Sequence, residues 1–156
     1  MSTPQRIQQL LDGRQLQELV APDADIAALW QKAVASVRDA RNSTTSLDNQ
    51  YVLGYQALLQ MGTALLACAG YRTRGAQGHH ATTFYTVSAL AIKGLEEIEI
   101  RTNRIREMRK VSAYEAGSPT PQQVAGLNAL LDEVMPLAYK WLVGQRPGTR
   151  FTPYAP

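Results

Sequence analysis

The chain has 156 residues, of which 45% are hydrophobic, and its formal net charge is +3. This length fits one domain with a real hydrophobic core, and the modest charge permits an acidic partner such as RNA without requiring one. The single cysteine, Cys68, excludes an internal disulfide framework and is interpreted as a small buried residue.

The N-terminal segment MSTPQRIQQ is polar, which predicts that no signal peptide is present. The longest apolar stretch, around residues 57–71, is interrupted by Gln60 and is too short to span a bilayer. We therefore expect a soluble, cytoplasmic protein with no membrane contact.

Helical patterns dominate the first half of the chain. Residues 4–20 are expected to form a short helix, either continuous or broken at Gly13, and a second helix is expected over 23–40. A third helix is predicted over 47–69, where apolar and small residues recur alternately four and three positions apart. Gly70 suits the position just after its end.

The second half begins with an irregular segment, 71–80, which we expect to be a loop because it contains two glycines and two arginines. Further helices are predicted over 79–93 and 95–115. No strand pattern competes with the helical ones, so the sequence predicts an all-α bundle of five or six helices with short connections.

The last predicted helix has a clear beginning. Thr120 is its expected cap, Pro121 its first residue and Gln123 the partner that completes a capping box. Pro136 is expected to kink the helix. The Pro- and Gly-rich tail, 144–156, is expected to be extended and either docked or disordered.

The predicted helix over 95–115 carries an arginine in an unusual position. At 100° per residue, Leu95, Ile98, Ile105 and Met108 share one apolar stripe, and Arg109 falls on the same stripe. An unpaired charge that faces a core or an interface is costly. Arg109 therefore has either a structural partner or a function, and the sequence leaves both readings open.

The other cations of this helix also have two readings. They could form a solvated face paired with neighbouring glutamates, or they could bind RNA or a nucleotide together with the arginines and the histidine of the preceding loop. The candidates for such binding are Arg72, Arg74, His79, Arg101, Arg104, Arg106 and Lys110.

Strong catalytic signatures are absent from the sequence: there is no Walker loop, no Rossmann glycine pattern, no HExxH motif and no CxxC pair. His79 and His80 are the only histidines, and adjacent helical residues point about 100° apart, so they cannot easily hold one metal together. We expect no metal site and no cofactor. The histidines either pack and hydrogen-bond, or they act on phosphate beside the arginines.

Three segments together resemble the prokaryotic branch of the HEPN superfamily, a group of small helical domains associated with nucleotide binding. They are LDNQYVLGYQALLQMGTALLACAGYRTR, then GAQGHHATTFYTVSALA, and then the helix that ends MRKVSAYEAG. The resemblance covers roughly residues 45–145. It implies an up-and-down four-helix bundle of HEPN type over 45–143. Residues 1–40 lie outside the resemblance, and we expect them to form additional N-terminal helices packed on this core, with the tail, 144–156, at the other end of the chain.

Active members of that family pair an arginine with a histidine a few positions later, and two subunits bring these pairs together to cleave RNA without a metal. The matching arginine here is Arg109, followed by Lys110, but Tyr114 occupies the position of the histidine. Tyrosine has an ordinary pKa near 10 and is a poor general base. The resemblance therefore implies the catalytic candidates Arg109 and Tyr114, in a degenerate motif. His79 or His80, of which we name His80 as the catalytic candidate, could replace the missing histidine if the loop folds back.

Three functional hypotheses follow. The first is a HEPN-like homodimer that acts as a binding or regulatory module in a toxin–antitoxin or antiviral defence system and contacts RNA, a nucleotide or a protein partner such as a nucleotidyltransferase. The second is a metal-independent endoribonuclease that uses Arg109 with Tyr114 or a histidine. The third is a structural helical subunit whose basic helix is simply solvated.

Overall fold

The computed structural model describes residues 3–42, 44–75, 78–114 and 117–154, without the side chains of 3–4 and 111–114. This part of the chain is mostly helical. In chain order its elements are α1 (Thr3–Asp12), β1 (Leu16–Glu18), α2 (Asp23–Ala40), α3 (Leu47–Ala69), β2 (Tyr71–Thr73), α4 (His79–Ala89), α5 (Ile98–Tyr114) and α6 (Pro121–Gln145).

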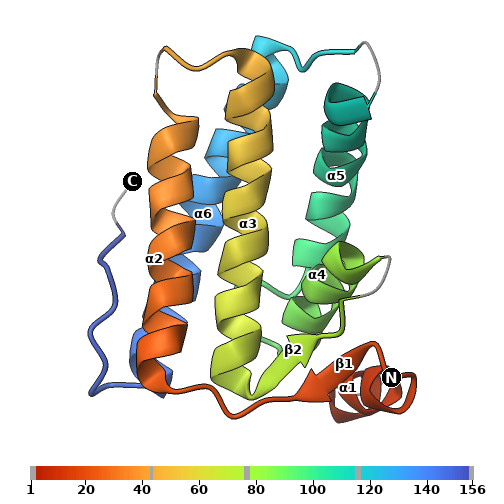
Figure 1. The fold of residues 1–156 in the computed structure, drawn as a ribbon, viewed down its shortest axis with the longest axis vertical. Helices are drawn as coiled ribbons and strands as arrows, with labels where there is room; N and C mark the ends of the chain where they lie inside the picture. The colour runs from red at the N-terminus through yellow and green to blue at the C-terminus, as the bar shows by residue number, and fades with distance from the viewer. Residues whose placement is uncertain (1–2, 43, 76–77, 115–116, 155–156) are drawn as a thin grey trace.

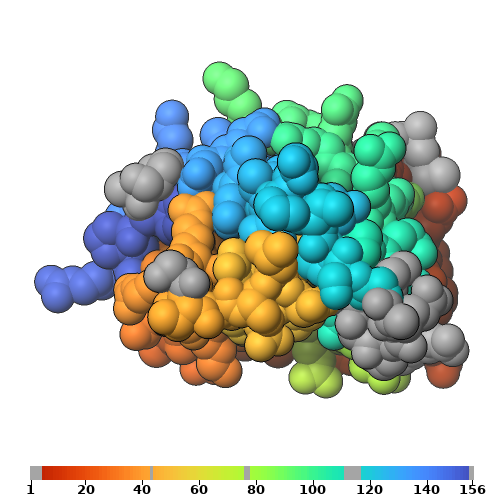
Figure 2. All heavy atoms as spheres, turned by 90° about the horizontal axis from the view of Figure 1, so that it is seen from above, coloured from red at the N-terminus to blue at the C-terminus, as the bar shows by residue number. Residues whose placement is uncertain are grey.

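The longest helices, α2, α3, α5 and α6, run alternately in opposite directions (Figure 1). Helix α3 is the centre of the bundle, because α2, α4, α5 and α6 all pack against it. The view onto the end where α3 and α6 begin shows their side chains next to one another, with α2 beside α3 (Figure 2). The expected all-α character is confirmed at this level.

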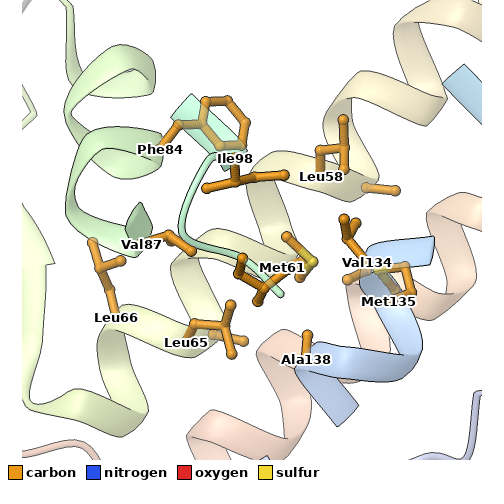
Figure 3. Packing of buried hydrophobic residues seen from close by; sticks show 14 of the residues in the cluster. Leu58, Met61, Leu65, Leu66, Phe84, Val87, Ile98, Val134, Met135 and Ala138 are labelled. Carbon is orange, nitrogen blue, oxygen red and sulfur yellow. The ribbon is translucent and has the colours of Figure 1, made fainter. Parts of the chain in front are cut away.

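The core lies where α3 meets its neighbours (Figure 3). Leu58, Met61 and Leu65 of α3 are fully buried there. Around them lie Phe84 and Val87 of α4, Ile98 of α5, and Val134, Met135 and Ala138 of α6. Burial of this apolar surface is the main force that holds the helices together.

The predicted limits of α2 and α3 are confirmed. At the start of α3, the backbone N–H of Asn49 donates to the Ser46 hydroxyl oxygen at 3.2 Å, which caps the helix. At its end Gly70 has φ +97°, a conformation that glycine adopts at no steric cost. Helix α3 is long and apolar enough to cross a membrane, but 61% of the qualifying window is buried within the fold, as in a core helix.

The capping box predicted for α6 is also present. The backbone N–H of Gln123 donates to Thr120 Oγ1 at 3.2 Å, and the backbone N–H of Thr120 donates to Gln123 Oε1 at 2.8 Å. Pro136 lies inside this helix; its kink stays a prediction. After α6 the tail lies against the bundle, with Phe151 buried and the Trp30 indole N–H donating to the Thr152 carbonyl oxygen at 2.8 Å.

The helix expected over 4–20 breaks at Gly13, as one alternative had it, but the residues after Gly13 are not helical, and the expectation of no strands was wrong. Helix α1 ends at Asp12, and Arg14 takes a left-handed conformation with φ +57° that reverses the chain. Strand β1 then pairs antiparallel with β2, in the segment predicted to be a loop, and Gln17 lies opposite Arg72. Strands of three residues are too short to show an alternating pattern, so the pairing depends on contacts distant in sequence.

The connection between α4 and α5 is longer than predicted. Helix α4 ends at Ala89 rather than near residue 93, and α5 begins at Ile98 rather than at 95. Ala91 and Gly94 have φ of +56° and +88°, conformations that end a right-handed helix. A side chain at Gly94 would also place its Cβ 2.5 Å from Leu137 Cδ1, so this close approach to α6 requires glycine.

Candidate functional site

A cleft of about 490 Å³ lies between the first turn of α4 and the middle of α5. Its lining consists of Gly78, His79, His80, Ala81, Arg106, Arg109 and Lys110. The structure thus brings together five of the residues that the sequence singled out: both histidines and three of the cations. None of the described residues that line the cleft carries a carboxylate, so this part of the cleft is a strongly cationic environment.

Two local features of the sequence build this cleft. Arg109 and Lys110 follow Arg106 by three and four residues, so both lie next to Arg106 on the surface of α5. Gly78, with φ +86°, turns the chain into α4 and caps the helix with no side chain. The positive end of the α4 dipole therefore borders the cleft, where it adds to the field of the three cations.

His80 contacts Tyr55 of α3 through a hydrogen bond and through its ring. The Tyr55 hydroxyl lies 3.0 Å from His80 Nδ1, and the two rings are 5.7 Å apart between centroids. Tyr55 is only 2% exposed, and burial raises the pKa of its hydroxyl. The hydroxyl therefore keeps its proton, and it donates to Nδ1 in one tautomer of the neutral imidazole and accepts from Nδ1–H in the other.

His80 is uncharged at neutral pH. Burial of the ring, followed by the charges of His79, Arg109 and Arg106, lowers the pKa of His80 from 6.5 to about 4. The neutral ring still carries one N–H group, on Nδ1 or on Nε2, which can donate one hydrogen bond. An anion in the cleft would offset the neighbouring cations and raise this pKa.

Arg109 lies across the Tyr55 ring, with its Cζ atom 5.5 Å from the ring centroid. Its Nε atom is buried and has no hydrogen-bond partner among the described residues. A buried donor without an acceptor costs about 1–3 kcal/mol, and such atoms are rare in native proteins. Arg109 therefore has hydrogen-bonding capacity that the described residues do not use, directly beside a cationic cleft.

The remaining predicted binding residues lie elsewhere. Arg101 donates two hydrogen bonds to the Glu133 carboxylate on α6, at 2.8 and 2.7 Å. Arg104 lines a separate groove between α5 and α6. Arg72 is exposed on β2, and the backbone N–H of Arg74 donates to the Gln15 carbonyl oxygen at 3.1 Å. The structure brings none of these side chains to the cleft.

The side chain of Tyr114, the other catalytic candidate, lies outside the described residues. Sequence reasoning did not select Tyr55, which supports both His80 and Arg109. Its spacing in α3 is that of a core residue, and only the packing of α4 and α5 on α3 reveals what its hydroxyl contacts. No sequence signal distinguishes it from Tyr51 in the preceding turn.

The chemistry that this arrangement supports is anion binding more readily than proton transfer. Efficient acid–base catalysis at neutral pH needs a group with a pKa near 7. The pKa of His80 lies well below that value, and the pKa of Tyr55 is raised above its ordinary 10. In the described part of the chain, no three His, Cys, Asp or Glu residues are grouped so that they could hold a metal ion.

No protein-family model matches this chain, and no curated protein or solved structure is significantly similar to it.

Proposed function

We propose that this protein is an RNA-binding module that holds phosphate in the cleft between α4 and α5. The main observation behind this proposal is that Arg106, Arg109 and Lys110 meet in one cleft whose described lining residues include no carboxylate. The unused Nε donor of Arg109 supports the same conclusion. Arginine and lysine contacts to phosphate supply most of the sequence-independent affinity of proteins for nucleic acids.

The wider setting of the proposal is the HEPN resemblance. In that setting the chain is a cytoplasmic homodimer in a toxin–antitoxin or antiviral defence system, and it regulates or assists a protein partner such as a nucleotidyltransferase. The bundle of alternating helices is compatible with this assignment. The position of Arg109 beside the only two histidines also supports it.

The direct test is RNA binding measured by fluorescence anisotropy over a range of salt concentrations. The wild type should bind a labelled single-stranded RNA with an affinity that falls steeply as salt rises. Arg109→Ala and Arg106→Ala should each weaken binding roughly 5- to 100-fold and make it less dependent on salt. Arg104→Ala is the matched control, because it removes the same charge from another side of the same helix.

Two results would overturn this proposal. One is no binding at high protein concentration, which would favour the third hypothesis, a structural subunit with a solvated basic helix. The other is an equal loss of binding in all three variants, because binding would then depend on the net charge of α5 and not on the cleft. Circular dichroism of each variant would exclude unfolding as the cause.

A second candidate, metal-independent RNA cleavage, is favoured by the meeting of Arg109 and His80 in one cleft. Arg109 could stabilise the charge that develops on the phosphate, and His80 could accept a proton, weakly. A panel of tRNA and single-stranded RNA incubated in chelator tests this activity. Cleavage by the wild type that is lost in a folded Arg109→Ala variant would establish the protein as a ribonuclease.

A further inference from the structure

The charge of the cleft exceeds what one internal RNA phosphate can balance. An internal phosphodiester carries a single negative charge, whereas a terminal phosphate monoester carries about −1.5 to −2 at pH 7. Three cationic side chains line the cleft, no carboxylate lies among its described lining residues, and the α4 dipole adds to the field of the cations. Only Lys110 of the three has a described ion pair, with the exposed Glu107 at 3.6 Å.

The donors of the cleft also match a terminal phosphate in number. A phosphate monoester has three free acceptor oxygens, while an internal phosphodiester has two. The cleft can offer three cationic donor groups, from Arg106, Arg109 and Lys110, among them the Nε–H of Arg109 that has no acceptor among the described residues. Charge-assisted hydrogen bonds of this kind are about twice as strong as neutral ones.

The form of the cleft favours the end of a chain over its middle. Its volume of about 490 Å³ lies within the range of small-molecule sites, so it has room for one nucleotide. Arg109, which lines the cleft, lies over the buried Tyr55 ring and has a buried Nε atom. An internal phosphate would have to bring both flanking nucleosides down with it, whereas a terminal phosphate brings only one.

We propose that the cleft between α4 and α5 selects a phosphate monoester, presented by an RNA end or by a mononucleotide. This inference rests on the proposed function and narrows it to a ligand class. The terminal phosphate would contact Arg106, Arg109 and Lys110, and its attached nucleoside would lie toward the cleft mouth. No bond is made or broken in this recognition.

The test compares one oligoribonucleotide with a 5′-phosphate, a 3′-phosphate or hydroxyl groups at both ends. One phosphorylated form should bind at least about fivefold more tightly than the hydroxyl form, because it adds charge-assisted hydrogen bonds. A hydroxyl-ended oligomer two nucleotides longer carries a matched total charge and should gain much less. AMP should compete with the RNA, whereas adenosine should not, and inorganic phosphate should compete more weakly than AMP.

Substitutions of single arginines test whether the selectivity for a terminal phosphate arises in the cleft. Arg109→Ala and Arg106→Ala should reduce the ratio of the two affinities, phosphorylated over hydroxyl, to about one, whereas Arg104→Ala should leave that ratio unchanged. Because the ratio compares two ligands on the same protein, a partly unfolded variant cannot mimic the loss. The preferred RNA end, 5′ or 3′, identifies the source of the monoester.

The outcomes separate this inference from the proposed function. If binding depends on Arg109 but all ends bind equally, the inference is overturned and RNA binding in the cleft stands. If AMP binds and RNA does not, the proposed function is overturned and the ligand is a mononucleotide. If none of the RNAs, AMP or phosphate binds, both are overturned.

Discussion

Arg101 and Arg109 lie on the same helix, and their surroundings make them different chemical groups. Arg101 is exposed, and its guanidinium forms two hydrogen bonds with the Glu133 carboxylate, which raise the pKa of Arg101 and lower that of Glu133. Arg109 lies over the Tyr55 ring with its Nε atom buried and without an acceptor among the described residues. One arginine is already satisfied within the chain, whereas the other retains capacity for a ligand.

The helix that faces each arginine determines whether its guanidinium is paired within the chain or remains available to a ligand. Helix α6 presents a carboxylate to Arg101, whereas α4 presents two histidines and its positive end to Arg109. A row of basic residues on α5 therefore says little about function until the opposing surfaces are known. The following predictions test whether the missing carboxylate is what distinguishes the two sites.

The largest effect is expected when the cleft receives the carboxylate that it lacks. Ala81 lines the cleft on α4, so Ala81→Glu would place a negative charge beside the three cations. We expect RNA binding to weaken roughly 10- to 100-fold, because the new carboxylate pairs with the arginines and repels phosphate. Anisotropy titrations measure the loss. Ala81→Gln, which has nearly the same shape and no charge, should lose far less, and equal losses would show that bulk alone is responsible.

Local signals explain why part of the fold could be predicted. The limits of α2 and α3 and the capping box of α6 depend on residues within one or two turns of each other. The pairing of β1 with β2 joins segments far apart in the chain, and no local pattern reports it. The end of α4 and the start of α5 were misjudged because Ala91 takes a left-handed conformation, which alanine rarely adopts and which the sequence therefore does not announce.

The candidate site was predictable to a similar extent. Helical periodicity placed Arg109 on an inward stripe, and the structure places it partly buried beside His80. The partner of Arg101 could not be read from the sequence, since Glu133 lies 32 residues away. Tyr55 has the spacing of a core residue, and its contact with His80 arises only when α4 packs on α3.

A second prediction concerns the pH dependence of the free energy of unfolding, to which His80 in the cleft contributes. The pKa of His80 is about 4 in the folded protein, below its ordinary 6.5. As the pH falls from about 6.5 to about 4, the unfolded chain takes up a proton that the folded chain does not, so the free energy of unfolding decreases. We expect a loss on the order of 1–2 kcal/mol, below the full linkage value because the ring is partly exposed.

Urea unfolding at several pH values checks this loss. Because other groups also titrate in the window, the informative quantity is the difference between the wild type and His80→Gln, which cannot take up that proton. The variant should lose less stability on acidification than the wild type. Identical pH profiles would mean that His80 titrates normally, and that Arg106 and Arg109 do not act on it.

A smaller effect is expected when the hydroxyl of Tyr55 is removed. Tyr55→Phe removes the hydrogen bond to His80 Nδ1 and keeps the ring under Arg109. The free energy of unfolding should fall by about 1 kcal/mol, as measured by urea denaturation. Tyr51→Phe is the matched control in the same helix, because the Tyr51 hydroxyl has no hydrogen-bond partner among the described residues. Equal effects of the two substitutions would contradict the assigned role of the Tyr55 hydroxyl.

The smallest effect tests the other half of the comparison, the Arg101–Glu133 pair. Both side chains are substantially exposed, and exposed ion pairs contribute about 0.2–1 kcal/mol. A double-mutant cycle with Arg101→Ala and Glu133→Gln should therefore give a coupling energy of about 0.5 kcal/mol that decreases with salt. A parallel cycle with Arg109→Ala and Glu133→Gln should give none.

Glu133→Gln should also leave RNA binding nearly unchanged, because Arg101, even when released from its partner, lies outside the cleft. An increase in RNA affinity as large as the loss caused by Arg109→Ala would show that any unpaired arginine on α5 binds RNA, and that the cleft has no special role.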